Sequence, residues 1–207
     1  MQTTTSLPDQ FEHDFSYEAN GQRYNGAQGT QTEVAIQARR IKALFGLNFD
    51  LDIRDFRPSF APHYRSYLAL VCPQLGLIQT SAAGNLHGYL LFQESITSLQ
   101  AQKYYRFLKD FLFADGASSF TMARRQPGSI NSKHGDGFVV QELQAASQVS
   151  PKEIDLLQQP EQEEVSALPR WLERSFRALF QLLSLDGQPY WREGRTNGIC
   201  PIHGSGN

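Results

Sequence analysis

Two aspartates one residue apart are the part of this sequence whose type and spacing could do chemistry. Asp50 and Asp52 lie in a short apolar run from Leu47 to Ile53. If this run is a β-strand, both carboxylates point to the same face, with Cα atoms about 6.5–7 Å apart. Carboxylates at that spacing could share a divalent cation or flank two, because hard cations prefer oxygen ligands. An isolated Asp-x-Asp is more often a pair of solvated acids on a surface strand, so the rest of the chain must decide.

Three later segments supply groups that suit a phosphate-bearing substrate. His87 follows a Gly84-Asn85 turn at the start of an expected strand, where its ring could donate a hydrogen bond to a phosphate. Asp115 follows an amphipathic helix. The segment from Arg124 to Lys133 places arginine and lysine around a Pro127-Gly128 turn, and these side chains bind phosphates well. Taken singly, these are a structural histidine, a helix-end residue and a solvated basic turn; together they suit two-metal phosphoryl transfer, as in polymerases and nucleases.

The elements that must position these residues follow from periodicity and turn signals. An Asn20-Gly21 turn predicts a hairpin. Helical spacing of apolar residues predicts helices over 32–45 (with Gly46 as its stop), 63–71, 97–113 and 168–185, and Pro151 opens a further helix. Strands are expected over 47–53, in two segments between 76 and 92, over 120–123 and over 138–143, with a loop over 124–133. This order predicts an α+β sheet domain rather than a regular βαβ fold.

Composition limits the class of protein. The chain has 207 residues, of which 40% are hydrophobic, enough for one well-formed core. Its net charge of −2 does not indicate a nucleic-acid binder, although a local basic groove can coexist with acidic ligands. Cys72 and Cys200 indicate no disulfide framework and fit a reducing, cytoplasmic location. The polar N-terminus does not match a secretory signal, and no apolar stretch approaches the ~20 residues that span a bilayer.

Three motifs, in order, resemble those of the archaeo-eukaryotic primase superfamily, specifically the primase-polymerases of plasmids, phages and mobile elements. The segment from Leu47 to Asp52 is similar to the first motif, an apolar strand that ends in Asp-x-Asp. A Ser/Gly turn before a strand-borne histidine is similar to the segment from Thr80 to Phe92, although here the turn is one residue longer. An aspartate followed by an Arg-x-Pro-Gly-Ser-x-Asn-x-Lys string is similar to Asp115 with residues 125–133. The resemblance covers roughly residues 35–145.

The resemblance implies a catalytic core with an RRM-like antiparallel or mixed sheet flanked by helices, followed by a C-terminal helical segment. It implies that Asp50, Asp52 and Asp115 hold two Mg²⁺ or Mn²⁺ ions. His87 would contact the phosphates of the incoming nucleotide, with Ser81 in the turn before it. Further along the chain, the resemblance assigns nucleotide or phosphate binding to Arg125, Asn131 and Lys133.

The same resemblance implies partners and a domain organisation. Expected partners are a single-stranded DNA template, ribo- or deoxynucleoside triphosphates, and a helicase or further domains of a longer chain, with no membrane. Residues 1–150 would form the catalytic domain, 151–190 a helical accessory segment and 191–207 a tail. The tail contains Cys200-Pro-Ile-His203, which resembles the first half of a zinc finger. Because structural zinc needs four ligands, we expect no bound zinc and a chain that is a fragment of a longer protein.

The expected activity is therefore template-dependent primer synthesis. Two alternatives use the same residues: a metal-dependent nuclease, and a replication-initiation module that binds single-stranded DNA without catalysis. The intact acids argue against the second, because a surface that only binds phosphates would do so better without them. A rolling-circle nicking enzyme needs paired metal-binding histidines, and no His-x-His occurs.

Overall fold

The structure is a computed structural model that describes residues 9–52, 61–115, 118–134, 137–158, 191–192 and 195–196. The chain divides into two compact units, and each is described by itself. The first unit consists of residues 1–52 and 74–158, and the second of residues 53–73 and 159–207.

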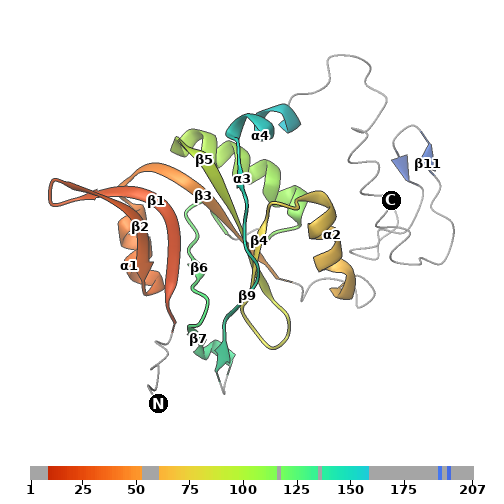
Figure 1. The fold of residues 1–207 in the computed structure, drawn as a ribbon, viewed down its shortest axis with the longest axis horizontal. Helices are drawn as coiled ribbons and strands as arrows, with labels where there is room; N and C mark the ends of the chain where they lie inside the picture. The colour runs from red at the N-terminus through yellow and green to blue at the C-terminus, as the bar shows by residue number, and fades with distance from the viewer. Residues whose placement is uncertain are drawn as a thin grey trace. The chain divides into compact units, whose positions relative to one another are not determined.

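A mixed, mostly antiparallel sheet forms the centre of the first unit (Figure 1). Its strand order is β2-β1-β3-β5-β4-β9. The bounds are β1 Phe11–Ala19, β2 Gln22–Gly29, β3 Ile41–Leu51, β4 Gly76–Gln79, β5 Leu86–Ile96 and β9 Gln141–Gln144. Two short strands join its sides: β10 (Gln148–Val149) pairs parallel with β5, and β6 (Arg124–Arg125) pairs antiparallel with β1. A separate ladder pairs β7 (Ile130–Asn131) with β8 (Phe138–Val139).

Helices pack against the sheet and confirm the predicted α+β class. They are α1 (Gln31–Ala38), α3 (Ser98–Leu112) and α4 (Pro151–Gln158). The predicted 97–113 helix is α3, and a capping box between Thr97 and Gln100 explains its start. The ring of Tyr105 on α3 stacks on Phe49 of β3 at 5.3 Å, so one face of the sheet is apolar and lies against α3, the helix that crosses the sheet in Figure 1.

The hairpin at Asn20-Gly21 is confirmed. Both turn residues have positive φ, 53° and 72°, which is the geometry that Asn-Gly favours in a two-residue turn. The turn joins β1 to β2, and Tyr17 stacks on its cross-strand partner Tyr24 at 5.2 Å.

The predicted helix over 32–45 is wrong in its second half. The helix α1 ends at Ala38, and β3 begins at Ile41. The spacing of apolar residues alone could not distinguish helix from strand here. Leu44 is buried because it pairs with Phe15 of β1, not because it lies on a helical face. Gly46 is a strand position, not a helix stop: a Cβ there would lie 2.6 Å from the backbone oxygen of Leu90.

The segment from residue 120 to 144 also differs from prediction. Residues 120–121 form a turn and residues 122–123 are irregular, and the predicted loop over 124–133 contains β6 and β7. The predicted strand over 138–143 is interrupted at Val140, whose backbone amide donates to Ser129 and whose carbonyl accepts from Gly128. Val140 thus pairs with Gly128 and Ser129, so the predicted strand is divided into β8 and β9.

In the second unit, a 3₁₀ turn (Ala61–His63) leads into α2 (Tyr64–Val71), which confirms the helix expected over 63–71. A two-stranded ladder pairs β11 (Trp191–Arg192) with β12 (Arg195–Thr196). The predicted helix over 168–185 and the Cys200/His203 pair lie outside the described residues.

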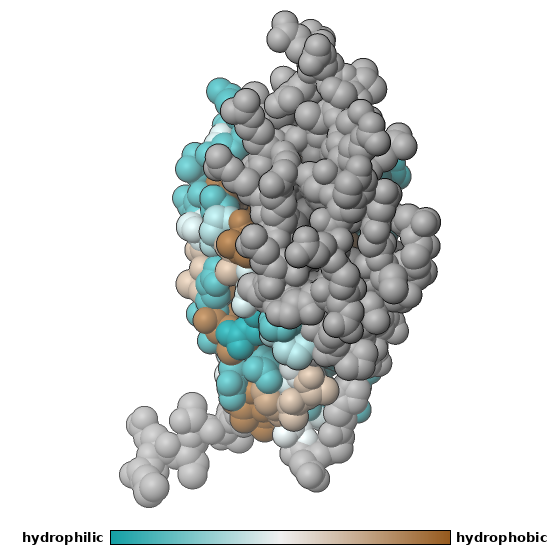
Figure 2. Space-filling view, turned by 90° about the vertical axis from the view of Figure 1, so that its right-hand side faces the viewer, coloured by the Kyte–Doolittle hydropathy of each residue, from teal (hydrophilic) through white to brown (hydrophobic). Residues whose placement is uncertain are grey.

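Where Figure 2 shows described residues, hydrophilic side chains are interrupted by small hydrophobic groups. Single exposed hydrophobic residues of this kind are normal for a globular chain. Among the described helices, none combines the length and the apolar character needed to cross a bilayer.

Candidate functional site

The face of the sheet opposite α3 is polar and brings Asp50 next to His87. The two residues are direct cross-strand partners of β3 and β5, and Asn48 and Tyr89 are the partners two residues further along. Side chains directly opposite each other in an antiparallel pair lie on the same face, with Cβ atoms about 4.5–5.5 Å apart. The residues between them, including Phe49, point to the apolar face. Strand pairing thus joins two predicted site residues that are 37 positions apart.

Asp115 reaches the same place from the end of α3. The helix stops at Phe113, whose φ of 54° reverses the chain. The backbone amide of Asp115 then donates to the carbonyl oxygen of Asp50 at 2.8 Å. Asp50 is half-buried and Asp115 is exposed. Two of the three predicted acids are therefore held side by side by a main-chain contact.

A pocket of about 380 Å³ opens beside these two acids. Its walls come from α1, the end of β3 and the segment after α3: Gln31, Ala35, Asp50, Asp115, Ser118, Ser119, Thr121, Met122 and Ala123. Asp52 is half-buried just beyond the end of β3 and is not part of this lining.

The acids of the pocket fit a divalent ion that also binds the substrate. Among the described residues, no three His, Cys, Asp or Glu side chains are grouped closely enough to hold a metal ion by themselves. Mg²⁺ is commonly held by one or two carboxylates together with substrate phosphates and water, which matches Asp50 and Asp115 facing one pocket. That Asp52 completes the ligand set remains a prediction.

Tyr105 is a buried residue of α3 that stacks on Phe49, the neighbour of Asp50 in the chain. Its helical spacing assigned it to the core, and its ring is indeed buried against Phe49. Burial raises the pKa of Tyr105, Ser118 lowers it, and the negative charges of Asp50 and Asp115 raise it again. The phenol therefore stays protonated at neutral pH.

His87 is buried and neutral. Its Nδ1 accepts a hydrogen bond from the backbone amide of Arg125 at 3.0 Å. Burial is the main cause that lowers the pKa of His87 to about 3, and the positive charges of Arg125 and Arg124 contribute to the same shift. Because an amide can only donate, Nδ1 carries no proton and the ring proton is on Nε2. His87 can therefore offer Nε2–H as a donor without carrying charge.

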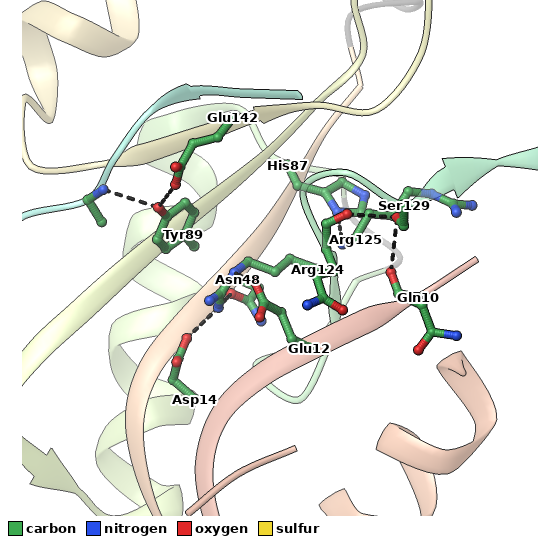
Figure 3. A network of polar contacts seen from close by, with 12 residues as sticks. Gln10, Glu12, Asp14, Asn48, His87, Tyr89, Arg124, Arg125, Ser129 and Glu142 are labelled. Carbon is green, nitrogen blue, oxygen red and sulfur yellow. Dashed lines mark hydrogen bonds and ion pairs between the residues drawn. The ribbon is translucent and has the colours of Figure 1, made fainter. Parts of the chain in front are cut away.

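Arg124, which was predicted to lie in a basic loop, is instead buried in the polar face (Figure 3). Its Nη1 donates to Asp14 and, at 3.1 Å, to Oδ1 of Asn48, while its Nε lies 3.2 Å from a carboxylate oxygen of Glu12. Its guanidinium also stacks on Tyr89, 4.4 Å from the ring centroid. No sequence signal separates Arg124 from Arg125; only the pairing of β6 with β1 does.

Arg125, the predicted phosphate-binding residue, is already paired with a carboxylate. Its Nη1 donates to Asp9 at 2.6 Å, and its guanidinium lies 4.7 Å from the ring centroid of Phe11. The hydroxyl of Ser132 donates to the other oxygen of Asp9. Hydrogen bonds from Ser132 and Arg125 lower the pKa of Asp9, so the pair is intact at neutral pH. A phosphate would have to compete with this carboxylate for Arg125.

The remaining predicted residues organise loops. The side-chain amide of Asn131 donates to the carbonyl of Thr80 at 2.6 Å and its oxygen accepts from the backbone amide of Lys133 at 3.1 Å, which ties the basic loop to the turn before β5. In that turn, the hydroxyl of Ser81 accepts from the amide of Asn85. The backbone of Lys133 is held in this way, while the residue itself is exposed.

If single-stranded DNA binds here, as the resemblance in the sequence implies, then removing the carboxylate that pairs with Arg125 should free a cation for its phosphates. For Asp9→Asn, we expect tighter binding to single-stranded DNA and a slope of log affinity against log salt that is steeper by about 0.7, the value for one additional phosphate contact. Fluorescence anisotropy across a salt series measures this slope. Asp155→Asn, which frees the exposed Lys103 elsewhere, is the matched control. An unchanged slope for Asp9→Asn would mean that Arg125 does not reach the nucleic acid.

Comparisons with known proteins give two solved structures. No protein-family model and no curated protein sequence matches the chain. The primase-polymerase domain of cyanophage S-2L aligns with 72% of this chain and 88% of its own, at 12% identity and a TM-score of 0.49. The primase RepB′ aligns with 84% of this chain and 59% of its own, at 13% identity and a TM-score of 0.41. Both similar structures are named as primases, the class of protein that the motifs of this chain resemble.

Proposed function

We propose that this chain is a template-dependent DNA primase or primase-polymerase, a nucleotidyltransferase that builds primers from nucleoside triphosphates on single-stranded DNA. The observation that carries the proposal is the convergence at one end of β3: Asp50 is the cross-strand partner of His87 and the main-chain partner of Asp115. Two acids that line one pocket, with a neutral imidazole as the cross-strand partner of one of them, suit a triphosphate that enters together with its metal ions.

Each side chain then has a distinct task. Asp50 and Asp115, with Asp52, would hold the divalent ions and so orient the α-phosphate toward the attacking 3′-hydroxyl. His87 would donate Nε2–H to a phosphate oxygen, because its Nδ1 already accepts from the Arg125 amide. Its pKa is lowered to about 3, mainly by burial, so the ring would donate without carrying charge. When bound, Mg²⁺ or Mn²⁺ would polarise the phosphate under attack and neutralise the departing pyrophosphate.

The basic loop would complete the binding of the polyanionic substrates. Lys133 is exposed and can contact phosphates of a bound substrate, whereas Arg125 would bind a phosphate only once that phosphate displaces Asp9. The polar hydroxyls of Ser118, Ser119 and Thr121 in the pocket wall can hydrogen-bond the sugar or phosphates of the nucleotide.

The decisive experiment is primer synthesis on single-stranded DNA with labelled ribo- or deoxynucleotides and either Mg²⁺ or Mn²⁺. The proposal expects extended products with the wild-type chain and their loss with Asp52→Ala. Absence of product with both ions would reject the function, whereas full activity of Asp52→Ala would reject the role of Asp52 alone.

Strand cleavage and DNA binding, measured beside primer synthesis, distinguish the two alternative functions from the proposed one. Strand cleavage without added nucleotides would indicate a metal-dependent nuclease on the same acids. Binding of single-stranded DNA that depends on salt but not on EDTA or nucleotide, with no product, would indicate a non-catalytic replication-initiation module.

A further inference from the structure

The segment from Phe120 to Gln126 lies across the polar face of the sheet and is anchored at nearly every step. We call this segment the strap. The carbonyl of Phe120 contacts His13 Nε2 at 3.1 Å, and the carbonyl of Met122 accepts from the side-chain amide of Asn48 at 2.9 Å. The amide of Gln126 donates to the carbonyl of Gln10 at 2.9 Å. The first half of the strap lines the pocket, and the second half contacts His87.

The most heavily anchored strap residue is Arg124. Its guanidinium is surrounded by Glu12, Asp14, Asn48 and the face of Tyr89, which come from three different strands (Figure 3). Tyr89 is itself held: its hydroxyl donates to Glu142 at 2.5 Å and accepts from the amide of Ala146 at 3.2 Å. A planar, permanently charged fork is needed to satisfy these partners at once, and lysine cannot replace it.

The peptide unit that follows Arg124 carries the amide that contacts His87. This amide, on Arg125, belongs to the peptide bond that links Arg124 to Arg125 and donates to Nδ1 of His87 at 3.0 Å. A change in the position of the Arg124 side chain would therefore move the amide that donates to His87 Nδ1. Without that donor, the imidazole could rotate or carry its proton on Nδ1, and the opposite nitrogen would become an acceptor that repels a phosphate.

We infer that Arg124 is a positioning residue, which fixes the strap so that the Arg125 amide holds His87 in the tautomer that presents Nε2–H to the substrate phosphates. The inference rests on the proposed function, in which His87 contacts those phosphates. It gives the two adjacent arginines separate roles. The Arg124 side chain positions the peptide unit that holds His87, whereas the Arg125 side chain forms an ion pair with Asp9.

The first test is spectroscopic and does not depend on activity. In the full chain labelled with ¹⁵N-histidine, the His87 signals, assigned with a His87→Gln variant, should show a proton on Nε2 and none on Nδ1 at neutral pH. Arg124→Met alone would leave Glu12 and Asp14 without their counter-charge, so the variant to use combines Glu12→Gln, Asp14→Asn and Arg124→Met. This neutralised variant should fold and should lose the single fixed tautomer of His87.

The second test is kinetic. In primer extension, Arg124→Lys and the neutralised variant should lower kcat/KM by about 10²-fold, the size expected when a group that contacts the substrate is slightly misplaced. Arg106→Lys, at an exposed position of α3, is the matched control and should behave as wild type. Arg124→Lys should retain more of the Nε2–H tautomer than the neutralised variant.

The outcomes separate this inference from the proposed function. A wild-type chain that makes no primers would reject the function, and the tautomer measurement would still decide the role of Arg124. A folded neutralised variant that keeps the Nε2–H tautomer of His87 and full kcat/KM would overturn the inference, as would a wild-type His87 protonated on Nδ1.

Discussion

Asp50→Asn is expected to reduce primer extension by about 10²–10³-fold while leaving the fold intact, because metal-assisted charge stabilisation at a phosphate is worth several kcal/mol. Asp50 is the residue on which the candidate site converges: His87 is its cross-strand partner, and the amide of Asp115 donates to its carbonyl. That backbone contact does not involve the carboxylate, so asparagine should keep the geometry and remove only the charge. The loss should therefore appear in catalysis and not in stability.

Two measurements test the effect of Asp50→Asn. Single-turnover extension of a primed template, with Mg²⁺ and Mn²⁺ titrated separately, reports the rate and the metal requirement, and thermal unfolding reports stability. Asp110→Asn, which neutralises an exposed carboxylate on α3, is the control. Wild-type extension rates in Asp50→Asn would remove Asp50 from the catalytic machinery, whereas a large loss of stability would assign it a structural role.

Acidification from pH 6.5 to 4 is expected to destabilise the first unit through His13, by about 3 kcal/mol, since one pKa unit corresponds to about 1.4 kcal/mol. His13 is 1% exposed, its ring lies 4.9 Å from that of Phe15, and its Nε2 donates to the carbonyl of Phe120. Its Nδ1 is buried and has no hydrogen-bond partner among the described residues. A second proton would thus place an unsolvated charge in the core.

The direction of this pH dependence follows from the pKa of His13. This pKa falls from 6.5 to about 4, mainly because of burial; the Phe120 carbonyl and Asp14 oppose the shift, and the charge of Arg124 adds to it. Between these two pH values the unfolded chain binds a proton that the folded chain excludes. The full contribution is therefore present above pH 6.5 and is lost as the pH falls to about 4.

His13→Phe tests this prediction, because phenylalanine can occupy the same place against Phe15 and cannot titrate. We expect a lower stability at neutral pH, by about 1–3 kcal/mol, since the Phe120 carbonyl loses its donor. Between pH 6.5 and 4, the variant should lose less stability per pH unit than the wild type. Urea unfolding at a series of pH values measures both slopes, with His63→Gln in the second unit as the control. Parallel slopes for His13→Phe and wild type would contradict the assignment.

Local signals in the sequence were sufficient for much of the fold. The Asn20-Gly21 turn and α3, with its Thr97/Gln100 capping box, depend on residues within a few positions of each other, and both were predicted correctly. The helix expected over 32–45 shows a segment for which local signals were not sufficient. Residues 41–44 have apolar spacing compatible with helix or strand, and pairing with β1 selects the strand.

The candidate site divides in the same way. The types and order of Asp50, His87 and Asp115 were evident from the sequence, because acids in an apolar strand and a histidine after a small-residue turn are local patterns. Their meeting depends on the register of β3 with β5 and on the reversal of the chain at Phe113. A shift of one residue in that register would turn either side chain to the other face, and no local signal determines it.

The sequence by itself determined the chemistry available to this protein: carboxylates for metal ions, an imidazole and a basic loop. Only the tertiary structure decided which of these groups are buried, paired or exposed. Arg124 and Arg125 are identical neighbours, yet one is enclosed by Glu12, Asp14 and Asn48 and the other is paired with Asp9. The physical reason is that burial and ion pairing depend on strands that meet across more than 100 positions of chain, whereas residue type and short-range periodicity do not.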